Sequence, residues 1–427
     1  MAPRRLASVW AALGLCVAQV QSQTPSATVS ELVTQALERN RDLLAARQRV
    51  AEAQGLLRQA GVRLAPTVEI GGSTGRPLGT RGEEEYSAGY FYPIETGGKR
   101  LKRVAVFEFG VTLAEAEVAE RSRQLAFEVK RRAAELIAAR RKQEALERLL
   151  GVSRESFQIT KVRVDRGDAA PLEQQLLATE LGRVEVQQAS FAGRAAAAML
   201  ELRQVVAPTA SDSLRVIENA SLAASTPLQQ LQERARAGRP DLRAARVLEE
   251  QAAAEVLLAR AQGLPDVTVS ASYARRNSFF DEQFGLTASG ALTQLRDHDN
   301  IVSFGVSVPL FTQRRNRGNV EAALARERGA RLRREYLEAT VPLEVEAAYR
   351  RWTAAQRAVT LFQRGVVEQS ERNLAVIRQA YTLGQLRVLD VLAEQRRVID
   401  TELSYIDAQA EVAQATAELE RAVGGNL

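Results

Sequence analysis

The sequence predicts a mainly α-helical fold with a small β part, in which one structural unit occurs twice. Residues 32–70 and 231–269 align without a gap, so that Asp42 corresponds to Asp241. In both copies a helical run stops at a proline, and two segments with period-two alternation follow. Helical sequence far longer than an ordinary globular helix comes next in each copy. The predicted unit is therefore a helix, two strands and a long helical hairpin.

The composition favours long helices over a mixed α/β core. Aromatic residues make up only 5% of the chain and charged residues 26%, with Ala, Leu, Glu, Gln and Arg prominent. The formal charge of +6 comes from 58 basic and 52 acidic residues that are interspersed along the chain. Because no basic block is combined with base-stacking aromatics, we expect no nucleic-acid partner.

The first residues have the pattern of a secretory signal. Arg4 and Arg5 precede an apolar stretch at 6–20, which is too short to span a bilayer. We therefore expect residues 1–22 to be a cleaved signal peptide. The only cysteine, Cys16, lies inside it in a context unlike that of a lipoprotein, so the mature chain should have neither a disulfide nor a catalytic thiolate.

The duplication sets the expected domain boundaries. Two repeats, at 23–206 and 227–427, should be joined by a linker at 207–226. The predicted strands lie at about 66–75, 85–93, 265–275 and 300–309, and the predicted hairpin turns at about 165–171 and 383–388. Polar stretches at about 75–85 and 276–300 should be the loops that join the strands of each pair.

Local signals refine this prediction. Thr28 and Glu31 have the spacing of a capping box at the start of the first repeat, as do Thr226 and Gln229 in the second. Pro342 lies inside the third long helical run, where we expect it to kink the helix.

The strand segments present a closure problem. Val302, Phe304 and Val306 alternate with Ser303 and Gly305, which is the pattern of a strand between lipid and water. In lipid every backbone polar group must be paired, and four strands are too few to close alone. Three chains would supply twelve strands. The fold prediction is therefore a trimer with a 12-stranded outer-membrane β-barrel, continued by an α-helical periplasmic tunnel. The alternative is a soluble helical-repeat protein with incidental hairpins.

Three segments resemble a known family. Residues 92–100 contain a glycine-lysine-arginine exit from the second strand, 308–318 contain a proline–leucine–phenylalanine exit from the fourth, and 381–392 have the pattern of a distal helical turn. Over the whole mature chain this layout resembles the TolC family of outer-membrane efflux proteins. The motifs are most similar to the outer-membrane subunits of cobalt–zinc–cadmium efflux systems.

The resemblance implies a passive duct and not an enzyme. It implies a homotrimer in outer-membrane lipid that meets a periplasmic adaptor protein and an inner-membrane RND-type pump, and that conducts heavy-metal cations or small toxic compounds without a cofactor. A periplasmic adaptor or coiled-coil scaffold is the alternative. Adaptors usually carry one hairpin flanked by compact β-domains, whereas this chain has two hairpins and two strand pairs.

The resemblance also implies a pore gate at the helical tips. Asp390 and Glu173 match acidic constriction residues, Tyr381 matches a gate tyrosine, and Arg387 lies near a gate arginine position. A second constriction acid would fall on Ala393, which departs from the family pattern, and Glu394 is displaced by one residue. Structural roles are the alternatives: Asp390 and Glu173 suit a first helical turn, and Tyr381 could pack against a neighbouring helix.

The two hairpin turns correspond to the region where the family meets its adaptor. The residues assigned to this contact are Gly167, Asp168, Pro171, Leu172, Gly384, Leu386, Val388 and Leu389.

No other motif points to chemistry. His298 is the only histidine, and we expect it to be solvated in an external loop and not to bind metal. Gly97-Gly98-Lys99 lacks the spacing of a phosphate-binding loop. We therefore expect no catalytic, cofactor-binding or metal site.

Overall fold

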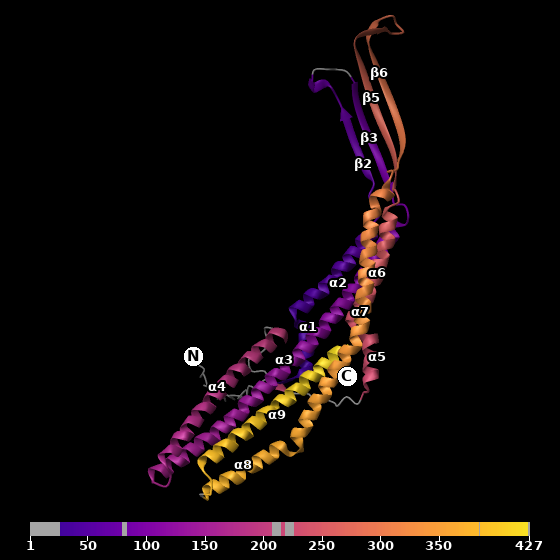
Figure 1. The fold of residues 1–427 in the computed structure, drawn as a ribbon. Coiled ribbons are helices and arrows are strands. Elements are labelled where there is room, and N and C mark those ends of the chain that lie inside the picture. Colours follow the sequence, from indigo (N-terminus) through magenta and orange to yellow (C-terminus); the bar gives the residue numbers. More distant parts are fainter. Residues whose placement is uncertain (1–25, 79–82, 207–214, 218–225, 384, 426–427) are drawn as a thin grey trace, which may run out of the picture.

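A computed structural model describes residues 26–78, 83–206, 215–217, 226–383 and 385–425. The predicted signal peptide with Cys16, most of the predicted linker and Gly384 lie outside the described residues. The molecule is elongated, with strands at one end and helices running away from them to the other (Figure 1).

The first repeat contains two short helices, two strands and a long hairpin. Its elements are β1 (Ser26–Thr28), α1 (Val29–Arg39), α2 (Arg41–Ala60), β2 (Thr67–Ser73), the 3₁₀ turn η1 (Arg76–Leu78), β3 (Glu83–Ile94), α3 (Lys99–Asp165) and α4 (Pro171–Val206). The 67 residues of α3 give it a length of about 100 Å.

The second repeat follows the same order. Its elements are β4 (Arg215–Ile217), α5 (Leu228–Gly238), α6 (Pro240–Gln262), β5 (Val267–Leu286), β6 (Leu292–Ser307), α7 (Thr312–Leu361), the π-helical turn η2 (Phe362–Val366), α8 (Val367–Thr382) and α9 (Val388–Val423). The predicted fold class, mainly helical with a small sheet, is confirmed. None of the helices within the described ranges is long and apolar enough to cross a membrane.

The two copies bury the same positions. Leu32 and Leu231 are fully buried, as are Leu43 and Leu242. In the first copy α1 packs with α3 and α4, and in the second α5 packs with α7 and α9. Each buried leucine contributes about 1.5–3 kcal/mol of hydrophobic free energy. In both repeats, a short helix therefore packs against a long hairpin through equivalent buried residues.

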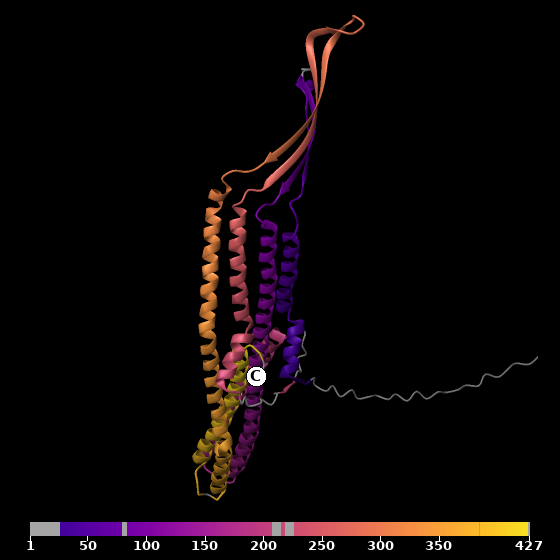
Figure 2. The ribbon, with the colours of Figure 1, turned by 90° about the vertical axis from the view of Figure 1, so that its right-hand side faces the viewer.

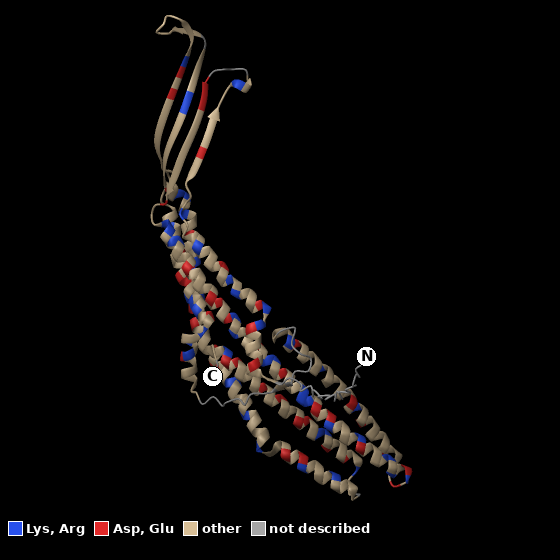
Figure 3. Ribbon diagram, turned by 180° about the vertical axis from the view of Figure 1, so that it is seen from behind, with Lys and Arg blue, Asp and Glu red and all other residues tan. Residues whose placement is uncertain are grey.

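The four longer strands form one antiparallel sheet in the order β2-β3-β5-β6. The register places Val68, Tyr90, Ala271 and Phe304 in one row across the sheet. The adjacent row, on the opposite face, consists of Glu69, Gly89, Ser272 and Ser303. One face of the sheet is therefore apolar, and the other carries small or polar side chains. Charged residues are sparser on the sheet than on the helices (Figure 3).

The second strand pair is longer than predicted. The stretch at 276–300, which we expected to be a loop, lies largely in β5 and β6. Arg276 lies opposite Asp299 on the neighbouring strand, so opposite charges face each other. Polar residues can therefore extend the strand pairing beyond the apolar segments. His298 is therefore on a strand and not in a loop, and its Nδ1 lies 2.9 Å from Oδ1 of Asn277.

The long helices form a layer with the same order as the sheet. Helix α2 packs on α3, α3 on α6, and α6 on α7, and Figure 2 shows these four helices side by side below the strands. Consequently β2 and α2 form one edge of the chain, and β6 and α7 form the other.

Polar side chains fix the junction between strands and helices, which we call the neck. Lys99 is buried, and its Nζ donates to Leu264 O at 2.7 Å and to Asp266 Oδ1 at 2.8 Å. Arg103 donates to Ala60 O, one of the carbonyls left free at the end of α2. Arg100, the arginine of the glycine-lysine-arginine motif, donates to Gly61 O at 2.7 Å. The motif therefore holds the segment before β5 and the end of α2 against the start of α3.

One local prediction is confirmed, and one is wrong. Thr28 and Glu31 form the predicted capping box. By contrast, α5 begins after Pro227 without a side-chain cap, so Thr226 does not serve as one. Pro342 lies inside α7. A break that was not predicted lies between α7 and α8, where the φ of Gly365, 119°, is outside the helical region. Figure 1 shows the chain changing direction between these two helices.

Candidate functional site

Both hairpin turns lie at the end of the molecule opposite the strands (Figure 1). In the first turn Gly167 has a φ of 82°, and Asp168 N donates to Arg163 O at 2.8 Å. This left-handed ending satisfies carbonyls at the end of α3 and reverses the chain. In the second turn Gln385 N donates to Ala380 O at 2.9 Å.

A hydrogen bond joins the two hairpins at this tip. Tyr381 at the end of α8 donates its hydroxyl to Glu173 Oε2 in the first turn of α4, at 3.0 Å. Burial raises the pKa of the Tyr381 hydroxyl, and the Glu173 carboxylate raises it further. The guanidinium of Arg163 lies over the tyrosine ring, 5.5 Å from its centroid. The structure thus brings together two of the four predicted gate residues.

An apolar cluster supports this contact. Leu177, Val388 and Leu392 are buried together, and Tyr381 packs against them. Val388, which we assigned to the adaptor contact, therefore contributes to the core of the tip in this structure.

Asp390 lies in the first turn of α9 and is exposed. Its Oδ2 accepts from Arg387 N at 3.0 Å, and its own N–H donates to Arg387 O. Arg387 is the N-cap residue, and its side chain is exposed. The carboxylate of Asp390 therefore stabilises the helix start, yet it remains in contact with solvent.

The two departures from the family pattern behave differently. Ala393 is exposed, whereas the side chain of Glu394 is only 5% exposed and pairs with Arg397 at 2.7 Å. Glu394 consequently cannot replace the missing second acid at an exposed position of α9 in this arrangement.

Besides Glu394, a second carboxylate is buried at the tip, and it was not predicted. Glu180 of α4 accepts from Arg183 on its own helix and from Arg396 on α9, at 2.6 and 2.5 Å. Burial alone would raise the pKa of Glu180, but the two guanidinium groups outweigh it and lower the pKa. The i,i+3 spacing of Glu180 and Arg183 was visible in the sequence, whereas the contact with Arg396 depends on tertiary packing.

Comparison with known proteins decides the family. The family model for outer membrane efflux proteins matches residues 32–207 and 231–425. The chain belongs to this family. The membership identifies an outer-membrane efflux channel, and it decides against the adaptor or scaffold that the sequence had left open.

Solved structures of outer-membrane channels share the fold of this efflux protein. The channel OprN is 20% identical with a TM-score of 0.74, and the match covers 93% of this chain and 90% of that one. VceC from Vibrio cholerae is 22% identical with a TM-score of 0.70, covering 93% and 96%. CusC is 20% identical with a TM-score of 0.72, covering 93% and 92%. A search of curated protein sequences returns no match.

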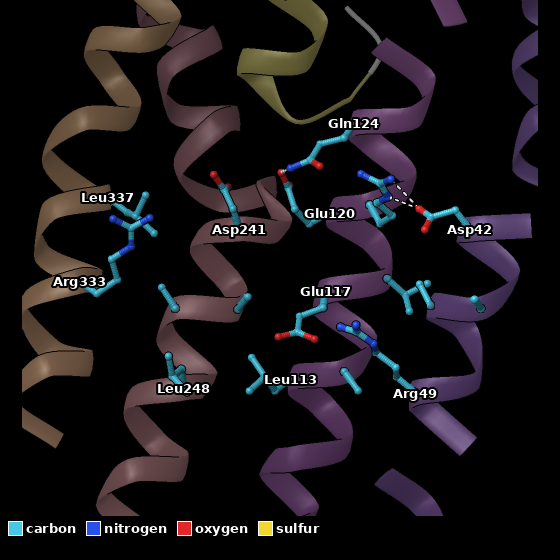
Figure 4. Close-up of a pocket in the computed structure, with 17 residues that line it drawn as sticks. Asp42, Arg49, Leu113, Glu117, Glu120, Gln124, Asp241, Leu248, Arg333 and Leu337 are labelled. Carbon is cyan, nitrogen blue, oxygen red and sulfur yellow. Dashed lines mark hydrogen bonds and ion pairs between the residues drawn. The ribbon is translucent and has the colours of Figure 1, made fainter. Parts of the chain in front are cut away.

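A hollow of this efflux protein lies in the helical layer, away from the tips. It has a volume of about 800 Å³ and is lined from α2, α3, α6 and α7, including the corresponding residues Asp42 and Asp241 (Figure 4). Because four neighbouring helices contribute to one hollow, this face of the layer is concave. Its charged lining residues are Asp42, Arg49, Glu117, Glu120, Arg121, Asp241 and Arg333.

The remaining predicted tip residues are mostly accessible. Leu172 and Leu389 are more than half exposed, Leu386 is about one-third exposed, and Asp168 and Pro171 are also at the surface. Across the part of the chain that the structure describes, no group of three or more His, Cys, Asp or Glu residues could hold a metal ion.

Proposed function

We propose that three copies of this chain form a continuous efflux duct through the outer membrane and the periplasm. The observation that carries the proposal is that sheet and helical layer have the same two free edges, β2 with α2 and β6 with α7. One threefold rotation would therefore close both layers at once, giving a barrel of twelve strands above a tunnel of helices.

The faces of the two layers suit this closure. The apolar row of the sheet would face lipid, and the row of glycine and serine would face the bore. The concave, charged face of the helical layer would line the tunnel and keep it wet. Conduction would be passive, because a duct needs only an open aqueous path.

The tips would form the gate and the contact with a periplasmic adaptor. The bond between Tyr381 and Glu173 would hold the hairpins together in the resting state, and three copies of Asp390 would form an acidic constriction. The exposed Leu172 and Leu389 would meet the adaptor, which links the duct to an RND-type pump. The motif at 92–100 favours heavy-metal cations as cargo, with small toxic compounds as the second candidate.

Several measurements test this function. The purified protein should run as a trimer that heat converts to monomers on a denaturing gel, and it should conduct ions in planar bilayers. Deletion of the gene should sensitise cells to zinc, cobalt or cadmium, whereas sensitivity to drugs alone would favour the second cargo class. A protein that fractionates as a water-soluble monomer would exclude the duct.

A further inference from the structure

Two complementary features lie on opposite edges of the neck. The first is Phe311, between β6 and α7, whose side chain is 76% exposed. Its φ of 61° makes it the only residue other than glycine with a positive φ within the described ranges. A bulky residue rarely adopts this conformation, and such outliers persist where a function requires them.

The second feature is an apolar groove between α2 and α3. It has a volume of about 490 Å³, and its apolar lining residues include Leu56, Val62, Leu64 and Phe107. Leu56, Val62 and Leu64 are exposed in the single chain. The groove therefore leaves a concave apolar surface open at the α2 edge.

An apolar side chain could enter this groove without isolating a charge. Two arginines line the groove, and Arg63 is exposed, so its guanidinium can stay in solvent. The guanidinium of Arg103 is paired with Glu95 at 2.7 Å and donates to Ala60 O at 2.9 Å. Because the charge is already neutralised, an incoming aromatic ring would displace water without leaving an unpaired guanidinium.

The topology brings the two features to the same level. Val62 and Leu64 lie in the segment that joins α2 to β2, and Phe311 lies in the segment that joins β6 to α7. Both segments are at the neck, on opposite edges of one chain. In a ring of identical subunits each β6–α7 edge meets the β2–α2 edge of the next copy.

We propose that Phe311 of each copy inserts into the groove formed by Leu56, Val62, Leu64 and Phe107 of the next copy. This inference rests on the proposed trimer, and it identifies Phe311 as the side chain that anchors each subunit to the next. An aromatic side chain in a preformed apolar pocket is the usual form of an interface hot spot. The anchor would fix two subunits where rigid strands meet long helices, and three such contacts would set the diameter of the neck.

Cysteine cross-linking tests the juxtaposition while Phe311 is kept. The variant with Leu64→Cys and Leu310→Cys should form disulfide-linked dimers and trimers when outer membranes are oxidised, and each single variant should not. The matched control combines Leu310→Cys with Leu101→Cys, because Leu101 is equally exposed but lies on the central helix α3. Equal cross-linking in the control, or none in the test pair, would overturn the proposal.

Substitution of Phe311 separates the anchor from local strain. Phe311→Ala should lower the temperature at which trimers dissociate on gels by several degrees, and Leu101→Ala should leave it unchanged. Phe311→Gly removes the strain of a positive φ and the ring together, so the difference between the glycine and alanine variants measures the strain. If Phe311→Ala trimers, in which the strain remains, are as stable as the wild type, the ring is not an anchor.

Other results of these experiments separate a failure of the Phe311 contact from a failure of the proposed duct. Trimers that are indifferent to Phe311 contradict the anchor alone, whereas the absence of trimers contradicts the proposed function. Retention of a phospholipid by wild-type trimers in native mass spectrometry, with its loss in Leu64→Asn and no cross-link, would assign the groove to lipid and would also overturn the proposal.

Discussion

At the scale of single residues, the first question is whether Tyr381 restrains the proposed gate through its hydroxyl or only through its ring. We expect Tyr381→Phe to keep the packing on Leu177 but to lose the bond to Glu173. A hydrogen bond to a charged group contributes about 1.5–3 kcal/mol, so spontaneous opening should become at least tenfold more frequent, as about 1.4 kcal/mol corresponds to tenfold. Single-channel recording in planar bilayers measures this frequency.

The control for this change is Tyr405→Phe, because Tyr405 packs on Phe362 at 5.7 Å on the same hairpin. If both variants open as rarely as the wild type, Tyr381 acts as a packing residue, which was the alternative from the sequence.

Glu180 predicts a pH dependence at the tip. Its pKa is lowered from an ordinary value of 4.5, so its ion pairs stabilise the folded tip above that value. This stability should be lost as the pH falls through the lowered pKa. At neutral pH, Glu180→Gln should weaken the tip by about 1–3 kcal/mol, because two arginines lose their counter-charge. In that variant acidification should have little further effect.

Hydrogen–deuterium exchange of the first turns of α4 and α9 measures this local stability, at pH 7 and at a pH below the lowered pKa of Glu180. Glu185→Gln is the matched control, since Glu185 is on the same helix in an exposed pair with Arg154. Equal exchange in the two variants at both pH values would contradict a role for the buried pair.

At the scale of elements, the sequence predicts features that depend on local signals. The long helices and the turn at Gly167 follow from periodicity and turn chemistry, and the capping box at Thr28 follows from spacing. The continuation of β5 and β6 could not be predicted, because cross-strand partners such as Arg276 and Asp299 make a polar stretch stable as a strand. Likewise, a glycine such as Gly365 within a helical pattern does not reveal a break in the helix.

In the candidate site, too, some features could be predicted from the sequence and others depend on tertiary packing. The positions of Tyr381 and Glu173 followed from the family resemblance, whereas the ion pair of Glu180 with Arg396 joins helices more than 200 residues apart. Such a contact depends on the rotation of α9 against α4, which no spacing within either helix determines.

The neck provides a prediction about elements. Lys99 connects α3 to the segment before β5, so Lys99→Met should remove the donor to Leu264 O and the counter-charge of Asp266, whose Oδ1 would still accept from Thr96 N. A hydrogen bond from a charged group contributes about 1.5–3 kcal/mol. We expect a severalfold lower yield of folded, heat-modifiable protein in the outer-membrane fraction. Lys161→Met, at an exposed position of the same helix, should leave the yield unchanged.

At the scale of the whole molecule, the duplication explains how one chain can be a third of a ring. Each repeat adds two strands and two long helices in the same order, so the chain has two different edges and no closed surface of its own. A head-to-tail assembly of such units either closes or grows without limit. The sheet requires closure, because free strand edges cannot be exposed to lipid.

In a threefold-symmetric duct, each charged residue near the axis would occur three times around the bore. Three Asp390 carboxylates at one level would attract cations into a narrow bore. Asp390→Asn is a selective test, because an Asn oxygen can still accept from Arg387 N and keep the helix start intact. We expect the ratio of cation to anion permeability to fall severalfold, so the reversal potential in a salt gradient should move towards zero. Asp168→Asn, in the exposed turn between α3 and α4, should leave it unchanged. If Asp390→Asn channels keep the wild-type reversal potential, Asp390 serves the helix start alone, and the selectivity of the duct must arise elsewhere along the tunnel.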